Sequence, residues 1–251
     1  MRLVVVRHHR GDGPGLLGGA FEEAGFSLQL HDGGKAGALP DPLRADAVVL
    51  LGSTWSVYDR SAVGSWIDAE LDWLRELHRT GTPVLGVCFG AQALAAAHGG
   101  GVERASRKEL GWVELEETTV PSVERGPWFE WHGDRCVLPP GSRLMARNEV
   151  AAQAFSLGRH MGVQFHPEVD RAQLASWIDQ GGRRELVAGG IDPEQLLEET
   201  ERQEELATGR AGRLVQGFLD RAAASRQPQR PPGPAAPGAA PGSPLLRPHH
   251  C

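Results

Sequence analysis

Apolar and polar residues alternate along the first hundred positions in blocks that predict strands and helices in turn. Continuous apolar runs, typical of strands covered on both faces, occur three times, and a weaker run resembles a fourth strand. Strands are expected over 3–7, 27–31, 46–52 and 84–87, with helices over 16–24 and 63–78. Strands and helices in this alternation predict crossover connections, and hence a mostly parallel sheet between two helical layers.

The pattern changes after residue 100. Short, turn-separated segments over 101–159 predict antiparallel strands that flank the main sheet. A strand that ends in a polar corner is expected over 160–170, with a helix over 172–180 after it. Two further helices are expected over 191–207 and 213–224, the first opened by Asp192 and Pro193. The predicted fold is therefore α/β, with a small antiparallel flank and extra C-terminal helices.

These elements divide the chain into three parts. Residues 1–180 are predicted to form the main domain, and 181–226 a C-terminal helical extension. Residues 227–251 are rich in Pro, Gly and Ala, a composition that buries too little apolar surface to fold alone, so a disordered tail is expected there.

Composition narrows the classes of function. A net charge of −6 over 251 residues argues against nucleic acid as a partner, because phosphate binding needs a clustered basic face. Neither a membrane span nor a signal peptide is visible, which predicts a cytoplasmic protein. The 3 cysteines form neither a disulfide framework nor a metal motif, and neither cofactor nor metal is predicted.

Cys88 lies where an apolar strand runs into an alanine-rich helix. Gly86 and Gly90 flank it at the positions where a sharp strand-to-helix turn brings backbone against backbone. Such a turn is expected to push the thiol into the open, and the positive end of the following helix favours a thiolate. The pattern predicts a cysteine nucleophile at the carboxyl edge of the sheet, where α/β proteins bind ligands.

A second chemical motif is His166-Pro167-Glu168. Side chains at i and i+2 of an extended backbone point to the same side, so Glu168 can orient the His166 ring. Cys88, His166 and Glu168 can then act as the nucleophile, the general base and acid, and the orienting group, respectively. An oxyanion hole is also required, and two candidates for it are the amide of Phe89 and the loop Gly52-Ser53-Thr54.

Other polar residues have weaker signals. His132 and Asp134 could contact a substrate, although stabilisation of their own loop is an equal alternative. His8 and His9 end the first strand and could face the site, but surface positions are favoured for both.

At these residues the chain resembles the class I, triad-type glutamine amidotransferases, especially their stand-alone, GMP-synthase-like branch. The resemblance covers roughly residues 1–178, through the segments GSTWSVYD, GVCFGAQ, GW, WHGD and GVQFHPEV in that order. It implies a flavodoxin-like domain in which Cys88 attacks the side-chain amide of glutamine. Ammonia then leaves, and water hydrolyses the γ-glutamyl thioester.

The resemblance also assigns roles. His166 and Glu168 complete the triad, and the backbone amides of Ser53 and Phe89 form the oxyanion hole. Gln92 holds the substrate, and we count Gly52 and His132 with it as expected substrate-binding residues. Where many relatives have Gly-Gly-Pro in the third-strand loop, this chain has Gly52-Ser53-Thr54, which keeps the amide but adds a Cβ.

Neither a glycine-rich phosphate loop nor a second catalytic domain follows the triad, so ammonia is expected to pass to a separate synthase partner. Two alternatives stay open. One is a hydrolase that acts on the γ-glutamyl amide of a small amine. The other is a non-catalytic binding or scaffold protein with the same fold.

Overall fold

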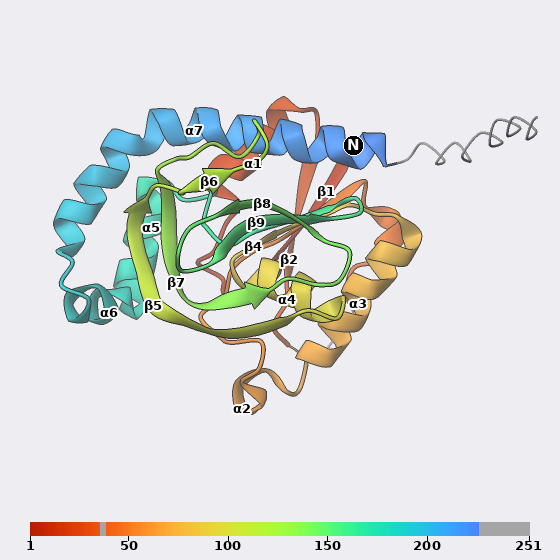
Figure 1. Cartoon of the computed structure of the whole chain (residues 1–251), viewed down its shortest axis with the longest axis horizontal. Helices are drawn as coiled ribbons and strands as arrows, with labels where there is room; N and C mark the ends of the chain where they lie inside the picture. The colour runs from red at the N-terminus through yellow and green to blue at the C-terminus, as the bar shows by residue number, and fades with distance from the viewer. Residues whose placement is uncertain (36–38, 226–251) are drawn as a thin grey trace, which may run out of the picture.

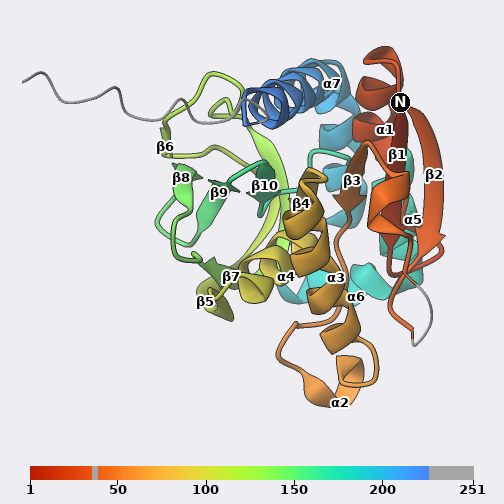
Figure 2. The same cartoon turned by 90° about the vertical axis from the view of Figure 1, so that its right-hand side faces the viewer.

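A central sheet of eight strands organises the protein, whose computed structural model describes residues 1–35 and 39–225. The strand order is β2-β1-β3-β4-β10-β9-β8-β6, and Figure 2 shows this order from right to left. The first five strands are parallel: β2 (Ser27–Asp32), β1 (Arg2–Arg7), β3 (Ala47–Leu50), β4 (Val84–Val87) and β10 (His160–Val163). The other three are antiparallel: β9 (Ala152–Leu157), β8 (Arg143–Arg147) and β6 (Glu117–Thr118).

Helices cover both faces of this sheet (Figure 1). Alternate residues of β1 point to opposite faces, so Leu3 and Val5 belong to one buried cluster and Val4 and Val6 to the other. The first cluster lies under α1 (Gly15–Glu23) and the long α7 (Pro193–Ala224), and the second under α3 (Ile67–Thr80) and α4 (Phe89–Ala97).

A second sheet stands beside the main one. Its two antiparallel strands, β5 (Gly101–Val113) and β7 (Trp128–Val137), form a long curved ribbon (Figure 1). A third apolar cluster joins this ribbon to α5 (Arg171–Trp177), α6 (Arg183–Ala188) and the start of α7. The remaining elements are short: a 3-10 turn over Pro42–Arg44, α2 (Arg60–Val63) and a π-helical turn over Ile178–Gly182.

The structure confirms the predicted parallel sheet between helical layers, and the antiparallel strands beyond residue 100 are present. Three of the predicted helices differ from those observed. The helix expected over 63–78 begins at Ile67, because the chain first makes the separate short helix α2. The helices expected over 191–207 and 213–224 are one helix, α7, which passes through Gly209 and Gly212.

Burial explains why α7 is continuous. Glycine inside a helix costs about 1 kcal/mol relative to alanine. The face of α7 that carries Leu214 and Phe218 is buried against the sheet and α1, and this burial outweighs that cost. Its start agrees with the prediction, because the Asp192 side chain accepts from the N–H groups of Glu194 and Gln195.

The predicted tail over 227–251 lies outside the described residues. Among the residues that are described, no helix has the length and hydropathy needed to cross a membrane.

Candidate active site

Cys88 occupies a strained turn between β4 and α4. Its φ of 49° makes it the one non-glycine residue with positive φ in the described part of the chain. The flanking glycines are required there, because a Cβ at Gly86 would lie 2.6 Å from the Gly90 carbonyl carbon, and one at Gly90 would lie 2.0 Å from the Leu50 oxygen. A strained non-glycine residue that its surroundings hold in place is typical of a functional site.

The Cys88 side chain is only 5% exposed, so the expectation of a thiol in the open was wrong. It lies instead on the wall of a cavity of about 880 Å³. The loop after β3 and the β5–β7 ribbon contribute to the same cavity wall. A nucleophile placed in this way is shielded from bulk water but accessible to a small substrate.

His166 and Glu168 lie beside Cys88, as predicted. The His166 Nδ1 atom is 2.7 Å from Glu168 Oε1, and the ring lies close enough to Cys88 for the sulfur to influence its pKa. The two reacting side chains converge at Gly52, where an added Cβ would lie 3.0 Å from His166 Cε1 and 3.6 Å from Cys88 Cβ. Because Nδ1 is occupied by Glu168, Nε2 is the ring nitrogen left to exchange a proton with the thiol.

Electrostatics favour a charged His166 ring at this site. Burial alone lowers the pKa of His166, but negative charge on Glu168 and Cys88 raises that pKa well above its usual value. The imidazolium form of His166 is therefore stabilised beside Cys88, and a cation next to the sulfur is what a cysteine nucleophile needs.

The N-terminal loop supports the pair from outside. Leu16 N–H donates to the Glu168 carbonyl at 3.0 Å, and Gly15 (φ 43°) has no room for a side chain there, since a Cβ would lie 1.9 Å from that oxygen. The Trp177 ring packs edge-on against His166 with centroids 5.0 Å apart, and Trp177 Nε1–H donates to Asp12. These contacts hold the base and its carboxylate in one orientation.

The two predicted oxyanion-hole residues come from different elements. Phe89 is the first residue of α4, directly after the nucleophile, and Ser53 lies in the loop after β3 on the cavity wall. Backbone amides at these positions are the groups predicted to stabilise a negative oxygen formed near Cys88.

The predicted substrate-binding residues Gly52, Gln92 and His132 all line the cavity. The amide nitrogen of Gln92 is directed at two protein acceptors, the Asp134 carbonyl and Gln164 Oε1, each at 3.3 Å. Direct contact of these three residues with a substrate stays a prediction.

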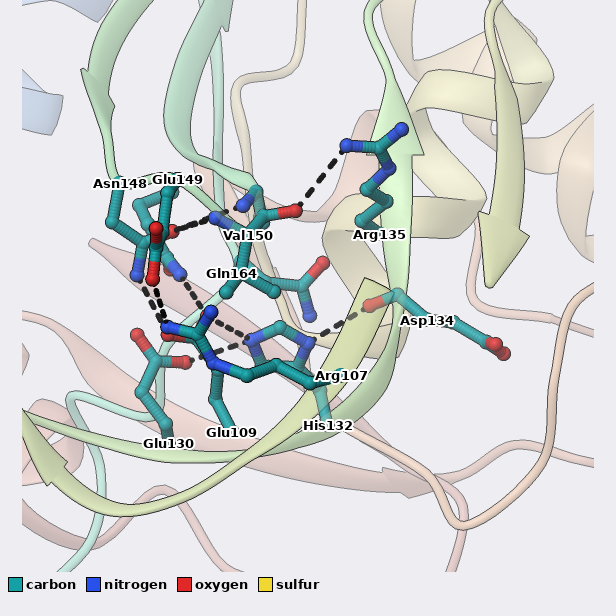
Figure 3. A network of polar contacts seen from close by, with 12 residues as sticks. Arg107, Glu109, Glu130, His132, Asp134, Arg135, Asn148, Glu149, Val150 and Gln164 are labelled. Atoms are coloured by element: carbon teal, nitrogen blue, oxygen red, sulfur yellow. Dashed lines mark hydrogen bonds and ion pairs between the residues drawn. The ribbon is translucent and has the colours of Figure 1, made fainter. Parts of the chain in front are cut away.

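His132 belongs to a buried polar network, which Figure 3 shows from close by. Its Nδ1 lies 2.9 Å from the Asp134 carbonyl, and its Nε2 lies 3.1 Å from Glu109 and 3.2 Å from Glu130. Burial opposes the charge on the ring, but the two glutamates raise the pKa of His132 to about 10. Both ring nitrogens therefore donate within the protein, which is the loop-stabilising role considered as an alternative.

Within residues 1–35 and 39–225, two groups of side chains have the proximity of metal ligands: Glu109, Glu130 and His132 form one group, and His78, His98 and His160 the other. The first is explained as an ion pair. In the second, Val84 N–H donates to His160 Nδ1 at 3.1 Å, so the neutral ring carries its proton on Nε2. That proton faces His78 Nδ1 at 2.9 Å, and a hydrogen bond accounts for the contact.

Sequence reasoning missed two connections to the loop after β3. His8 was expected at the surface, but it is only 8% exposed and lies 3.2 Å from the Gly52 carbonyl. The Asp134 carboxylate accepts from the hydroxyl groups of Ser56 and Tyr58, which ties the same loop to β7. The position of His8 at a strand end was a sequence signal that it could face the site. No sequence signal indicated its buried partner Glu70, which lies 62 residues away.

A buried thiol at a strand-to-helix turn, beside a histidine that a glutamate orients, defines a cysteine enzyme of the acyl-transfer class. Comparison with known proteins gives the family: a model of the glutamine amidotransferase class-I family matches residues 38–178. The chain belongs to that family, which confirms the predicted class of enzyme.

Individual relatives agree with this assignment. A GMP synthase [glutamine-hydrolyzing] of Thermus thermophilus is 35% identical over 173 residues, which are 64% of this chain and 32% of the relative. That of Thiobacillus denitrificans is 32% identical over 171 residues, which are 61% of this chain and 31% of the relative. The chain thus spans about a third of the length of these curated relatives.

Solved structures confirm the fold. A glutamine amidotransferase from Thermotoga maritima superposes with a TM-score of 0.79 at 29% identity, over 88% of this chain and 98% of that one. A glutamine amido transferase from Methylobacillus flagellatus has a TM-score of 0.77 at 22% identity, over 88% of this chain and 94% of that one, and shows the fold alone.

Proposed function

We propose that the chain hydrolyses the side-chain amide of glutamine to glutamate and ammonia. The observation that carries the proposal is the convergence of Cys88 and His166 beside Gly52, with Glu168 on the far nitrogen of the ring. Membership of the class-I family supports glutamine as the substrate.

The reaction follows from the positions of these groups. The Cys88 thiolate attacks the amide carbon and forms a C–S bond, and the carbonyl electrons move to oxygen, where the Ser53 and Phe89 amides stabilise the charge. His166 then protonates the leaving nitrogen, the C–N bond breaks and ammonia departs. In the second half, His166 takes a proton from water, which attacks the thioester, and the thiolate leaves as glutamate forms.

Ammonia is proposed to pass to a separate synthase. The curated relatives are named as glutamine-hydrolysing GMP synthases, and the chain spans about a third of their length. The synthase step would therefore be supplied by another polypeptide or by a further domain. A cytoplasmic location, a helical extension over 181–226 and the absence of a cofactor remain predictions from the sequence.

The test is release of glutamate and ammonia from glutamine by the purified chain, alone and with lysate from its source. Cys88→Ala should abolish release, whereas Cys136→Ala, which changes a second buried free cysteine outside the triad, should retain it. A glutamine-mimicking electrophile should label wild type and Cys136→Ala at Cys88. Neither release nor labelling, under both conditions, would refute the proposal.

The same assay separates the alternatives. Fast hydrolysis of γ-glutamyl derivatives of small amines, with slow hydrolysis of glutamine, would favour the γ-glutamyl amide hydrolase. Full biological activity of Cys88→Ala would favour a scaffold protein.

A further inference from the structure

We propose that His8, held by Glu70, is a positioning residue for the oxyanion hole. It would fix the peptide between Gly52 and Ser53 so that the Ser53 N–H faces the reacting carbonyl. The inference rests on the proposed glutamine hydrolysis, and it assigns a role to two buried side chains that the triad mechanism does not use.

The geometry of one peptide plane connects His8 to the oxyanion hole. The Gly52 carbonyl and the Ser53 N–H belong to the same trans peptide, so they point in opposite directions. His8 Nδ1 lies 3.2 Å from the Gly52 oxygen. A carbonyl oxygen only accepts, so Nδ1 carries the proton and donates. Holding the carbonyl on one side therefore fixes the direction of the N–H on the other.

The rest of the loop places that N–H near the chemistry. Gly52 lies against the reacting pair, since its missing Cβ would touch both His166 and Cys88. Rotation of the Gly52–Ser53 peptide would exchange the two groups, and the carbonyl oxygen would take the place of the N–H. An oxyanion would then meet a negative dipole end in place of a donor. The His8 hydrogen bond opposes this rotation.

Neighbouring side chains restrict rotation of the His8 ring. Its Nε2 atom lies 3.1 and 3.3 Å from the two carboxylate oxygens of Glu70, a residue that is 1% exposed. The ring also packs edge-on against Phe89, with centroids 4.8 Å apart, and it lies tilted against Trp66, with centroids 5.4 Å apart. His8 thus contacts the Phe89 ring and the carbonyl of the peptide whose N–H belongs to Ser53, and the amides of Phe89 and Ser53 are the two predicted to form the oxyanion hole.

A purely structural role would differ in one measurable respect. If the buried His8–Glu70 pair only joined β1 to α3, its removal would lower stability and would affect all reactions of Cys88 alike. A positioning role lowers only reactions that form an oxyanion. Alkylation of the thiolate by iodoacetamide forms none, and hydrolysis of glutamine does, so the two rates separate the roles.

The test compares wild type, His8→Phe and His8→Asn, with His31→Phe on β2 as a matched control. His8→Phe keeps the ring but removes the donor, and kcat for glutamine should fall about 10- to 100-fold, somewhat less than loss of an oxyanion-hole donor itself. KM should change less than kcat, and the iodoacetamide rate at Cys88 should stay within about twofold of wild type, because the triad electrostatics are untouched. His8→Asn, whose amide can donate from near the Nδ1 position, should recover part of kcat.

Unchanged kcat in His8→Phe, or equal falls in kcat and in the alkylation rate, would overturn the proposal. Hydrogen exchange in a peptide that spans residues 50–56 is measured on the same proteins, and it should be faster in His8→Phe alone. Wild type that neither releases glutamate nor is labelled at Cys88 by the glutamine-mimicking electrophile, under both conditions, would refute the proposed function. The exchange measurement would still decide the role of His8, since equal exchange in all four proteins contradicts it.

Discussion

His166 and His132 line one cavity, and each is buried against glutamate, yet their rings differ in which nitrogen remains free. His166 bonds Glu168 through Nδ1 and keeps Nε2 for Cys88. His132 uses Nδ1 for the Asp134 carbonyl and Nε2 for two glutamates. The same two residue types therefore build a base that can exchange a proton and a cation that cannot. The number of partners, more than the residue type, determines the role.

The largest expected effect comes from replacing each of the two histidines by asparagine, since the two rings should then respond very differently. His166→Asn removes the proton carrier, and kcat for glutamine should fall about 1000-fold, within the range for loss of a general acid and base. His132→Asn keeps a donor near the Asp134 carbonyl, and its kcat should fall about 10-fold or less. Steady-state glutamate release measures both. Equal losses in the two variants would show that His132 also takes part in proton transfer.

The next test concerns the carboxylates. Glu168→Gln removes the charge that stabilises the His166 imidazolium, so kcat should fall about 10- to 100-fold, and the iodoacetamide rate at Cys88 near neutral pH should fall as well. Glu109→Gln, at the other ring, should leave that alkylation rate within about threefold of wild type, because His132 retains Glu130 as a partner. A fall in Glu109→Gln as large as in Glu168→Gln would contradict the separation of the two rings.

The smallest expected effect is on stability against pH. The pKa of His132 is raised to about 10 in the folded chain, from an ordinary value of 6.5. Its stabilising contribution is therefore fully present below pH 6.5 and is lost as the pH rises through about 10.

Urea unfolding of wild type and Glu130→Gln at pH 6, 8 and 10 measures this dependence. With one carboxylate fewer, the pKa of His132 should lie lower, and the loss should begin at lower pH. The change in the free energy of unfolding between pH 6 and pH 10 should differ by about 1 kcal/mol between the two proteins, since one pKa unit corresponds to about 1.4 kcal/mol. Parallel curves would show that Glu130 does not hold the proton on His132.

Local sequence patterns were enough to predict the frame of the molecule. Residues 84–87 form β4 as expected. Gly86 and Gly90, on either side of Cys88, lie against backbone atoms that leave no room for a Cβ, as the sequence predicts. His166 and Glu168 are two residues apart, so an extended backbone alone brings them together. These features depend on neighbours in the chain, which is why sequence reasoning reached them.

Features that depend on distant pairing were not predictable. Glu109 meets His132 because β5 and β7 pair in that register, and a shift of one residue would turn the side chains to opposite faces. His8 meets Glu70 because α3 packs on the face of the sheet where β1 ends. Helix α7 continues through its glycines because of what it covers. In each case a long-range contact overrides or completes a weak local signal.

The burial of α7 has a consequence for how the protein unfolds. The helix spans about 48 Å at 1.5 Å per residue over its 32 residues, and Ala211, Leu214 and Phe218 belong to the same apolar cluster as Leu3 and Val5 of the first strand. Its release would expose to water the part of this cluster that α7 covers beside α1. Helix α7 and strand β1 should therefore melt together, and a protease should cut α7 only in chains that have already unfolded.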